Sequence, residues 1–278
     1  MLARVVVEGG AIVHEEGDRS DVPWWSVTKT VIAAAALVLV GEGRLDLDAP
    51  LPGRPYTLRL LLQHRAGLRD YGGVVAYKQA VARHEAAWPP EVMLERARAD
   101  QPAGEPGTAF GYSNIGYFFV REIVERAAGA PLGPALDRLV LQPLGIAGVR
   151  LATGRGELAP DYDSRWVYHG SLIGPLARAA LFMDGLLSGR LLRPDLLTAM
   201  LERVPIGDLP EGLFWKSAAY GLGIAGGRAE AGPELIGHTG GGPGSTVAVY
   251  RGSRRTAATF GRDEDQMTVE QSCEAMLI

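Results

Sequence analysis

The chain has 278 residues, of which 47% are apolar and 22% charged, and this balance is typical of a globular protein with a large buried core. A net charge of −4, with arginines and acids interspersed, excludes the basic surface on which nucleic-acid binding depends. The single cysteine, Cys273, excludes an intrachain disulfide.

The N-terminal residues predict no targeting segment. Residues 1–10 lack a positive region followed by a long apolar one, so we expect no signal peptide. The longest apolar run, residues 31–40, is too short to span a bilayer and suits a buried helix instead. We therefore expect a cytoplasmic protein that does not associate with a membrane.

Strand signals lie at both ends of the chain, and helix signals lie in the middle. Two apolar runs around a Gly-Gly turn, at 5–7 and 11–13, predict a hairpin, and an apolar helix follows from about 26 to 40. Helix start and stop signals then predict helices at 57–62, 89–97, 113–129, 175–187 and 194–201. The last part predicts a closing helix at 265–277, preceded by strands at 220–224, 235–239, 246–250 and 255–260.

This order of elements predicts an α+β fold. We expect the two chain ends, 1–50 and 206–278, to form one lobe in which helices flank an antiparallel sheet. Residues 51–205 are expected to form an inserted, mainly helical lobe. An active site would then lie between the two lobes.

The chain contains three lysines against 25 arginines, and one of them, Lys29, follows Ser26 by three residues. A serine hydroxyl is a poor nucleophile until a neighbouring base takes its proton, and a buried lysine can be that base whereas arginine cannot. Residues three apart share a helix face, so Lys29 can reach the Ser26 hydroxyl. The alternative is that Ser26 only caps the helix and Lys29 is exposed; the scarcity of lysine favours the catalytic interpretation.

A second candidate element is the Tyr-Ser-Asn run that contains Tyr112 and Asn114. The Tyr112 hydroxyl can exchange a proton with Ser26 or with a leaving group, and the Asn114 amide can hold a substrate carbonyl and position Lys29. Taken alone, the run has a simpler interpretation, in which Ser113 or Asn114 caps a helix and Tyr112 is a packed aromatic residue.

A third candidate element is His238-Thr239-Gly240-Gly241, at the end of a predicted strand. Glycines let a substrate backbone lie close to a strand edge, and the Gly241 N–H can join that of Ser26 as an oxyanion hole. His238 can polarise Tyr112 or bind a carboxylate. The alternative for this stretch is an ordinary glycine-rich turn.

The three elements, Ser-x-x-Lys, Tyr-Ser-Asn and His-Thr-Gly-Gly, follow one another in this order. In this respect the chain resembles the serine β-lactamase and penicillin-binding protein family, most closely its class C branch. That branch also holds D-Ala-D-Ala carboxypeptidases, D-aminopeptidases and many esterases. Further stretches that resemble the family are Gly41 to Asp48, Leu58 to Leu68 and the Gly-His-Thr-Gly-Gly-Gly-Pro-Gly run.

The resemblance implies a DD-peptidase/β-lactamase-like fold and assigns roles by position. Ser26 becomes the acylated nucleophile, and Lys29 and Tyr112 share the general-base and general-acid work, with the order of proton transfer left open. His238 stands where the family often has lysine. The small number of residues before Ser26, and the short chain, predict an open or differently shaped pocket.

The implied activity is that of a serine hydrolase acting through an acyl-enzyme. We expect a small ester or amide as substrate, because His238 replaces the usual lysine and because β-lactam and peptidoglycan targets lie outside the cytoplasm. The alternatives are a β-lactamase, D-Ala-D-Ala carboxypeptidase or D-aminopeptidase, or a penicillin-binding sensor without turnover. The oligomeric state is left open.

Two further residues, Tyr168 and His169, precede the helix at 175–187, where the chain of this family tends to pass the cleft, so we expect both to line the pocket. His64 lies in a stretch that resembles a structural motif of the family and is expected to be scaffold. No histidine pair with neighbouring acids has metal-ligand spacing, so we expect neither a metal nor another cofactor.

Overall fold

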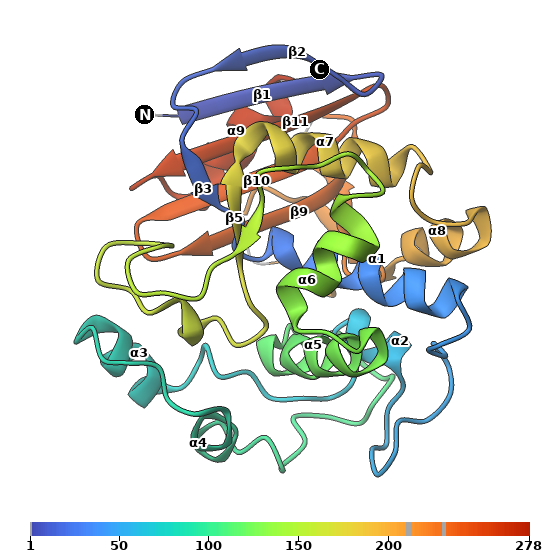
Figure 1. Cartoon of the computed structure of the whole chain (residues 1–278), viewed down its shortest axis with the longest axis vertical. Helices are drawn as coiled ribbons and strands as arrows, with labels where there is room; N and C mark the ends of the chain where they lie inside the picture. The colour runs from blue at the N-terminus through green and yellow to red at the C-terminus, as the bar shows by residue number, and fades with distance from the viewer. Residues whose placement is uncertain (1, 210–212, 230–231) are drawn as a thin grey trace.

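The sheet of this protein joins the two ends of the chain. A computed structural model describes residues 2–209, 213–229 and 232–278 (Figure 1). Within them, eight strands form one antiparallel sheet in the order β2-β1-β11-β10-β9-β8-β7-β6. The strands are β1 (Leu2–Glu8), β2 (Ala11–Glu16), β6 (Val204–Pro205), β7 (Ser217–Tyr220), β8 (Ala225–Arg228), β9 (Glu234–Gly242), β10 (Ser245–Arg251) and β11 (Arg255–Arg262). The expected α+β fold, with a sheet built from both chain ends, is confirmed.

The predicted hairpin at the N-terminus is confirmed. The turn between β1 and β2 lies at Gly9 and Gly10, and both glycines have positive φ angles that other residues rarely adopt. The register of the pair shifts between Val6 and Val7, which is the signature of a β-bulge. β1 then pairs along its whole length with β11, so the first strand lies inside the sheet.

The sheet buries both of its faces, and strand β10 shows how. Val247 and Val249 point into the main core, which they share with the central and flanking helices. Ala248 and Tyr250, which alternate with them, point into a smaller core under the C-terminal helix α9 (Gln266–Ala275). A strand with period-two alternation but no polar face is expected where helices cover a sheet on both sides.

The other helices lie on the face of the sheet opposite α9 (Figure 1). They are α1 (Val27–Gly41), α2 (Leu58–Leu62), α3 (Val75–Ala82), α4 (Pro90–Arg96), α5 (Asn114–Ala128), α6 (Leu132–Leu136), α7 (Leu176–Leu187) and α8 (Pro194–Leu201). Figure 1 shows α1 between the sheet and helices α2 and α5, while α7 lies against the sheet. The helices expected near 26–40, 57–62, 89–97, 113–129, 175–187 and 194–201 are present, whereas α3 and α6 were not expected. The division into lobes at residues 50 and 205 stays a prediction.

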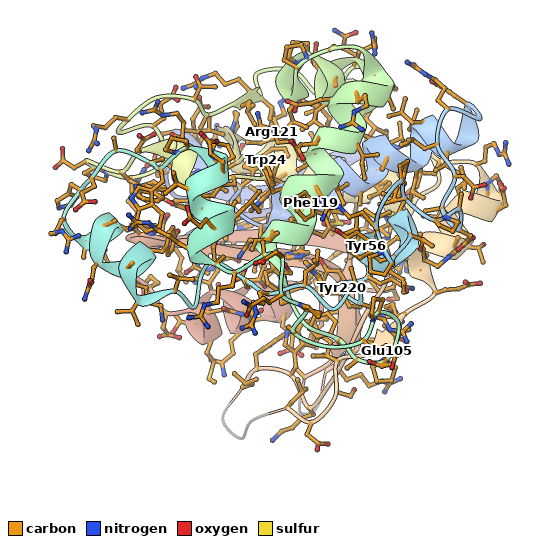
Figure 2. All side chains as sticks on the ribbon, turned by 90° about the horizontal axis from the view of Figure 1, so that it is seen from below. Trp24, Tyr56, Glu105, Phe119, Arg121 and Tyr220 are labelled. Carbon is orange, nitrogen blue, oxygen red and sulfur yellow. The ribbon has the colours of Figure 1, made fainter. Side chains whose placement is uncertain are left out.

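Helix α1 is the centre of the core. Every residue from Val31 to Leu37 is fully buried, as an apolar run without a polar face predicts. Trp24, just before the helix, is buried as well, and so is Tyr220 at the end of β7 (Figure 2). The four alanines at 33–36 leave little side-chain bulk, so neighbouring elements approach the helix closely.

The strand predicted at 220–224 is wrong. β7 ends at Tyr220 and β8 begins at Ala225, so the residues between them form a turn. Gly223 has a φ of +77°, and a Cβ there would lie 2.3 Å from the Cβ of Ala33 on α1. Gly223 is needed because this turn packs directly against the central helix, and Gly221 is needed because the turn also lies close to the Met200 carbonyl oxygen of α8. Local sequence does not encode these tertiary contacts.

A second, three-stranded sheet links the segments on either side of the site. It consists of β3 (Asp21–Pro23), β5 (Leu172–Pro175) and β4 (Arg150–Leu151), in that order. Three residues separate β3 from α1, and β5 begins three positions after His169. Elsewhere, none of the helices in the described ranges is long and apolar enough to cross a membrane.

Candidate active site

Ser26 is the N-cap residue of α1 and is half-buried. The preceding residue, Trp25, has a φ of +42°, a region that is uncommon for a bulky residue and is often found at functional sites. The Trp25 indole nitrogen donates a hydrogen bond to the Ser245 Oγ at 3.0 Å, which anchors this turn to β10. The turn therefore presents the Ser26 hydroxyl in a fixed position at the start of the central helix.

Lys29 lies one turn further along α1 and is fully buried. Its Nζ lies 3.0 Å from the Ser26 Oγ, 2.8 Å from the Asn114 Oδ1 and 3.0 Å from the His169 Nε2. A neutral amine has two N–H groups and one lone pair. Asn114 and His169 can accept both N–H groups, and the lone pair then points to the Ser26 hydroxyl.

Tyr112 completes the contacts of the Ser26 hydroxyl. Its Oη donates a hydrogen bond to the Ser26 Oγ at 3.0 Å. The His64 ring packs against the Tyr112 ring, with centroids 4.2 Å apart, and its Nδ1 accepts the Ser113 N–H at 3.1 Å. This placement agrees with the expectation that His64 is scaffold.

Asp70 orients Asn114 and was missed by the sequence analysis. Its Oδ1 accepts the backbone N–H of Asn114 at 2.7 Å, and its Oδ2 accepts the Asn114 Nδ2–H at 3.3 Å. Because the amide nitrogen of Asn114 is held by Asp70, its oxygen faces Lys29. A single aspartate in a chain with 32 acidic residues gives no signal of this role.

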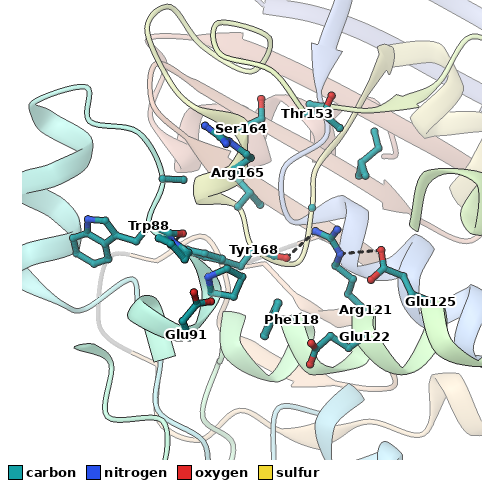
Figure 3. Close-up of a pocket in the computed structure, with 17 residues that line it drawn as sticks. Trp88, Glu91, Phe118, Arg121, Glu122, Glu125, Thr153, Ser164, Arg165 and Tyr168 are labelled. Atoms are coloured by element: carbon teal, nitrogen blue, oxygen red, sulfur yellow. Dashed lines mark hydrogen bonds and ion pairs between the residues drawn. The ribbon is translucent and has the colours of Figure 1, made fainter. Parts of the chain in front are cut away.

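His169 lines the pocket as expected, but Tyr168 does not. The Tyr168 hydroxyl donates to the Trp88 carbonyl oxygen at 3.0 Å, and the residue lines a separate cavity of about 700 Å³. Figure 3 shows that cavity, where Arg121 contacts both the Tyr168 carbonyl oxygen and Glu125. The prediction for Tyr168 is wrong because adjacent side chains on this turn point in different directions.

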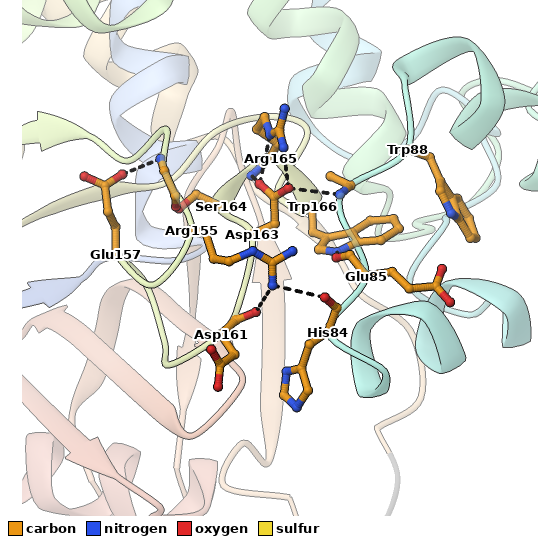
Figure 4. Close-up of polar contacts among 12 residues, drawn as sticks. His84, Glu85, Trp88, Arg155, Glu157, Asp161, Asp163, Ser164, Arg165 and Trp166 are labelled. Atoms are coloured by element: carbon orange, nitrogen blue, oxygen red, sulfur yellow. Dashed lines mark hydrogen bonds and ion pairs between the residues drawn. The ribbon is translucent and has the colours of Figure 1, made fainter.

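The loop that carries His169 is held by polar contacts, several of them made by the buried Asp163 (Figure 4). Asp163 accepts hydrogen bonds from the Ala87 N–H at 3.0 Å and from the Arg165 guanidinium at 2.7 Å. The Arg165 contact lowers the pKa of Asp163 to about 2. Arg155 donates to the carbonyl oxygens of His84 and Asp161, which ties the loop to the segment after α3.

The third element brings β9 against the Ser26 turn. A Cβ on Gly240 would lie 2.6 Å from the Ser26 backbone nitrogen, so only glycine fits there. Gly241 is open, with its nearest neighbour, the Thr246 Oγ1, 3.8 Å from a Cβ position. Ser26 and Gly241 line the same cavities, as an oxyanion hole made from their N–H groups would require.

His238 does not contact Tyr112. Its Nδ1 lies 2.6 Å from the Thr239 carbonyl oxygen, which can only accept, so Nδ1 carries the proton. Its Nε2 lies 2.8 Å from the Tyr220 Oη and therefore accepts the phenol proton. Burial, with Lys29 nearby, lowers the pKa of His238 to about 4, so the ring is neutral near pH 7. The predicted role in polarising Tyr112 is wrong, and a neutral ring is a poor ligand for a carboxylate.

Two cavities open on either side of the Ser26 hydroxyl. The first, of about 250 Å³, is lined by Asn114, His169 and a group of aromatic residues. The second, of about 370 Å³, is lined by His238, Thr239 and the inner face of α9. Ser26, Tyr112 and Gly241 line both cavities, so a bound molecule can extend in two directions from the nucleophile. We call these the first arm and the second arm.

The pKa shifts in the site favour one direction of proton transfer. Burial lowers the pKa of Lys29 from 10.5 to about 7, although Asp70 opposes the shift. Burial raises the pKa of the Tyr112 hydroxyl above its usual value of 10, even though one side of the residue remains exposed. It also lowers the pKa of His169 well below 6.5, with Lys29 adding to the effect. Near neutral pH the amine can therefore accept a proton, while the phenol keeps its own.

The lowered pKa of Lys29 predicts a pH-dependent stability. Because the unfolded chain holds this proton up to about pH 10.5 and the folded protein releases it near pH 7, stability should rise with pH between these values. We expect the unfolding free energy of the wild type, relative to Lys29→Met, to increase by roughly 4 kcal/mol from pH 7 to pH 10 and to stay level below pH 7. Denaturant titrations of both proteins across this range measure the difference. A difference that does not vary with pH would contradict the shift.

A family model described as Beta-lactamase matches residues 3–269. The chain belongs to the beta-lactamase family. Esterase EstB of Burkholderia gladioli is 34% identical over 141 residues, which cover 44% of this chain and 36% of the esterase. The D-aminopeptidase of Cereibacter sphaeroides is 31% identical over 136 residues, which cover 48% of this chain and 24% of the peptidase. The aligned parts thus span only about a quarter to a third of these relatives.

Solved structures of other proteins are similar to this chain over nearly its whole length. A D-stereospecific amidohydrolase from Streptomyces sp. superposes with a TM-score of 0.83 at 25% identity, covering 100% of this chain and 94% of that one. The D-amino acid amidase of Ochrobactrum anthropi SV3 gives a TM-score of 0.80 at 22% identity, over 99% and 94% of the two chains. The expected β-lactamase-like fold is confirmed.

Proposed function

We propose that this protein is a serine hydrolase that cleaves a small ester or amide through an acyl-enzyme on Ser26. The observation that carries the proposal is the contact of 3.0 Å between the Ser26 hydroxyl and the buried amine of Lys29. With a pKa of about 7, that amine is partly free of its proton at neutral pH and can act as a general base. The names of the family's esterase, aminopeptidase and amidase members support the same class of reaction.

In the acylation step, Lys29 takes the proton of the Ser26 hydroxyl as Oγ forms a bond to the substrate carbonyl carbon. The N–H groups of Ser26 and Gly241 stabilise the oxyanion. The bond to the leaving group then breaks, and the leaving group takes a proton from Tyr112. The Lys29 ammonium returns a proton to Tyr112, so that the proton released by Ser26 ends on the leaving group.

Deacylation reverses the proton path. A water adds to the acyl carbon and gives a proton to Lys29, and the Lys29 ammonium then returns that proton to the Ser26 Oγ as the bond to the acyl carbon breaks. We assign the first base to Lys29 because its pKa is lowered while that of Tyr112 is raised. Asn114 and His169 hold the amine in position for both steps, and Asp70 holds Asn114.

The neutral state of His238 bears on the choice of substrate. β-Lactams and D-Ala-D-Ala peptides carry a carboxylate, and His238 stands where the family often has a lysine that would face it. A ring with a pKa of about 4 supplies no positive charge near pH 7. We therefore favour esters and amides without a carboxylate over β-lactams and D-Ala-D-Ala peptides. The expected cytoplasmic location stays a prediction.

A substrate panel tests this proposal. We expect turnover of a short-chain aryl ester and of an aryl amide of a D-amino acid, and little or no hydrolysis of a chromogenic cephalosporin. Release of the aryl product, followed by absorbance, measures all of these rates. A stable adduct with no turnover of any ester or amide would instead identify a sensor, and efficient cephalosporin hydrolysis would identify a β-lactamase.

His169 is proposed to be a positioning residue for Lys29. Replacing it with leucine removes the acceptor of one amine N–H and is expected to lower kcat/KM roughly 10- to 100-fold. Glutamine places an acceptor near the position of the histidine Nε2, so His169→Gln should restore most of the rate. Steady-state kinetics of both variants provide the test. Equal losses in the two variants would indicate that His169 only fills space.

A further inference from the structure

The second arm contains a buried carboxylate that the proposed mechanism does not use. Glu270 on α9 is 2% exposed and lines this arm together with Ser26 and Tyr112. Its Oε1 lies 2.5 Å from the Thr239 Oγ1, 2.8 Å from the Tyr250 Oη and 3.2 Å from the Gln266 Nε2. All three groups can donate a hydrogen bond, so the glutamate acts as the acceptor.

No positive charge balances Glu270 within the part of the chain that the structure describes. Neither lysine nor arginine is among the residues that line the second arm, and His238, which does line it, is neutral near pH 7. A buried carboxylate without a cationic partner is costly, and three hydrogen bonds to one oxygen offset only part of that cost. A cation bound in the second arm would supply the partner that this buried carboxylate lacks.

The aromatic side chains that line the second arm also favour the binding of a cation. Trp215 and Tyr250 meet edge to face with ring centroids 5.3 Å apart, and Phe110 and Tyr220 lie 5.6 Å apart. Both pairs line the same arm as Glu270. Aromatic faces attract organic cations, most strongly where water is excluded, and the carboxylate adds a full negative charge to that attraction.

The first arm, unlike the second, has no charged side chain in its described lining. Its described lining consists of apolar, aromatic, amide and hydroxyl groups together with His169, whose pKa is also lowered far below 6.5. No carboxylate lines it, because Asp70 lies behind Asn114 and is bound to it. The two sides of the nucleophile are therefore unlike, with an uncharged first arm and a negatively charged second arm.

We propose that the second arm binds a positively charged amine of the substrate, with Glu270 as the residue that determines this specificity. The proposal rests on the proposed hydrolase function and narrows its substrates to esters or amides that carry an alkyl- or arylammonium group. The same charge repels a substrate carboxylate, which agrees with the neutral His238 beside it. The cation occupies the arm between Trp215 and Thr239, close to the Ser26 hydroxyl.

Three small aromatic probes of similar shape test the charge preference by binding alone. Benzylammonium, benzyl alcohol and benzoate are titrated into the wild-type protein, and dissociation constants are measured by NMR. We expect benzylammonium to bind about tenfold more tightly than benzyl alcohol, and benzoate to bind most weakly. Equal affinities of benzylammonium and benzyl alcohol, or a preference for benzoate, would overturn the proposal.

Two variants locate the source of the preference. Glu270→Gln keeps an acceptor oxygen for Thr239 and Tyr250 but removes the charge, so the tenfold preference should disappear. Glu274→Gln, one turn further along α9 and outside the lining of the arm, makes the same charge change and should keep the preference. A folded Glu270→Gln that still prefers the cation would overturn the proposal.

The binding experiment with the three probes tests the Glu270 subsite independently of whether the protein hydrolyses any substrate. If neutral esters are hydrolysed but the probes bind alike, the hydrolase function stands and the inference about Glu270 fails. If no ester or amide is hydrolysed but benzylammonium binds preferentially, the subsite stands and the hydrolase function fails. Should Glu270→Gln not fold, the three probes on the wild-type protein still decide the question.

Discussion

Replacing Lys29 with methionine is expected to lower kcat/KM about 10³-fold or more while the protein stays folded. Methionine has nearly the same length and suits a fully buried position, but it cannot accept the Ser26 proton. The loss should appear mainly in kcat, because Lys29 itself lines neither arm and contacts the reacting Ser26 hydroxyl from behind the lining residues. Steady-state kinetics on an aryl ester measure it.

Lys78 provides the matched control for this experiment. It lies on α3, is exposed, and is one of the other two lysines in the chain. Lys78→Met makes the same chemical change away from Ser26 and should leave kcat/KM within about twofold. If Lys29→Met kept a rate close to that of Lys78→Met, the amine would not be the base and the proton would have to leave through another group.

Ser26→Ala is expected to have the largest effect of any single substitution, a fall in kcat of about 10⁴-fold or more. Removing the hydroxyl eliminates the acyl-enzyme, and only the oxyanion hole and substrate binding remain to accelerate the reaction. Alanine fits the N-cap position without strain, because Ser26 makes no side-chain capping hydrogen bond. The variant should therefore unfold at nearly the same denaturant concentration as the wild type.

Combining Ser26→Ala with Lys29→Met tests whether the hydroxyl and the amine act in the same step. Residues that act as one unit have non-additive effects, so the double variant Ser26→Ala, Lys29→Met should be about as inactive as Ser26→Ala alone. Initial rates on the same ester provide the measurement. A further large loss in the double variant would mean that the amine and the hydroxyl act in separate steps or at separate sites.

Local sequence rules predicted the contacts of the site that lie within a single helix or turn. The spacing of Ser26 and Lys29 places them on one face of α1, because residues three apart in a helix are neighbours. The hairpin and the helix starts at Thr57 and Ser113 also follow from local signals, since glycine turns and capping side chains act over a few residues. The resemblance to the β-lactamase family then predicted that Tyr112 and Asn114 lie at the same site as Ser26.

The parts that could not be predicted depend on contacts between distant elements. Asp70 orients Asn114 across 44 residues, and Glu270 meets Thr239 across 31, so neither carboxylate gives a local signal. The turn at 221–224 was mistaken for a strand because its glycines are required by contacts with α1 and α8, which lie elsewhere in the sequence. Tyr168 was misplaced because the direction of a side chain on a turn depends on the whole loop.

Intact-protein mass spectrometry after treatment with a fluorophosphonate tests the central claim most directly. The claim is that Ser26 is a nucleophile made reactive by the amine of Lys29. The account predicts one adduct, located on Ser26 by peptide mapping, absent from Ser26→Ala and formed far more slowly by Lys29→Met than by Lys78→Met. An adduct on another residue, or equal labelling rates in the two lysine variants, would contradict it.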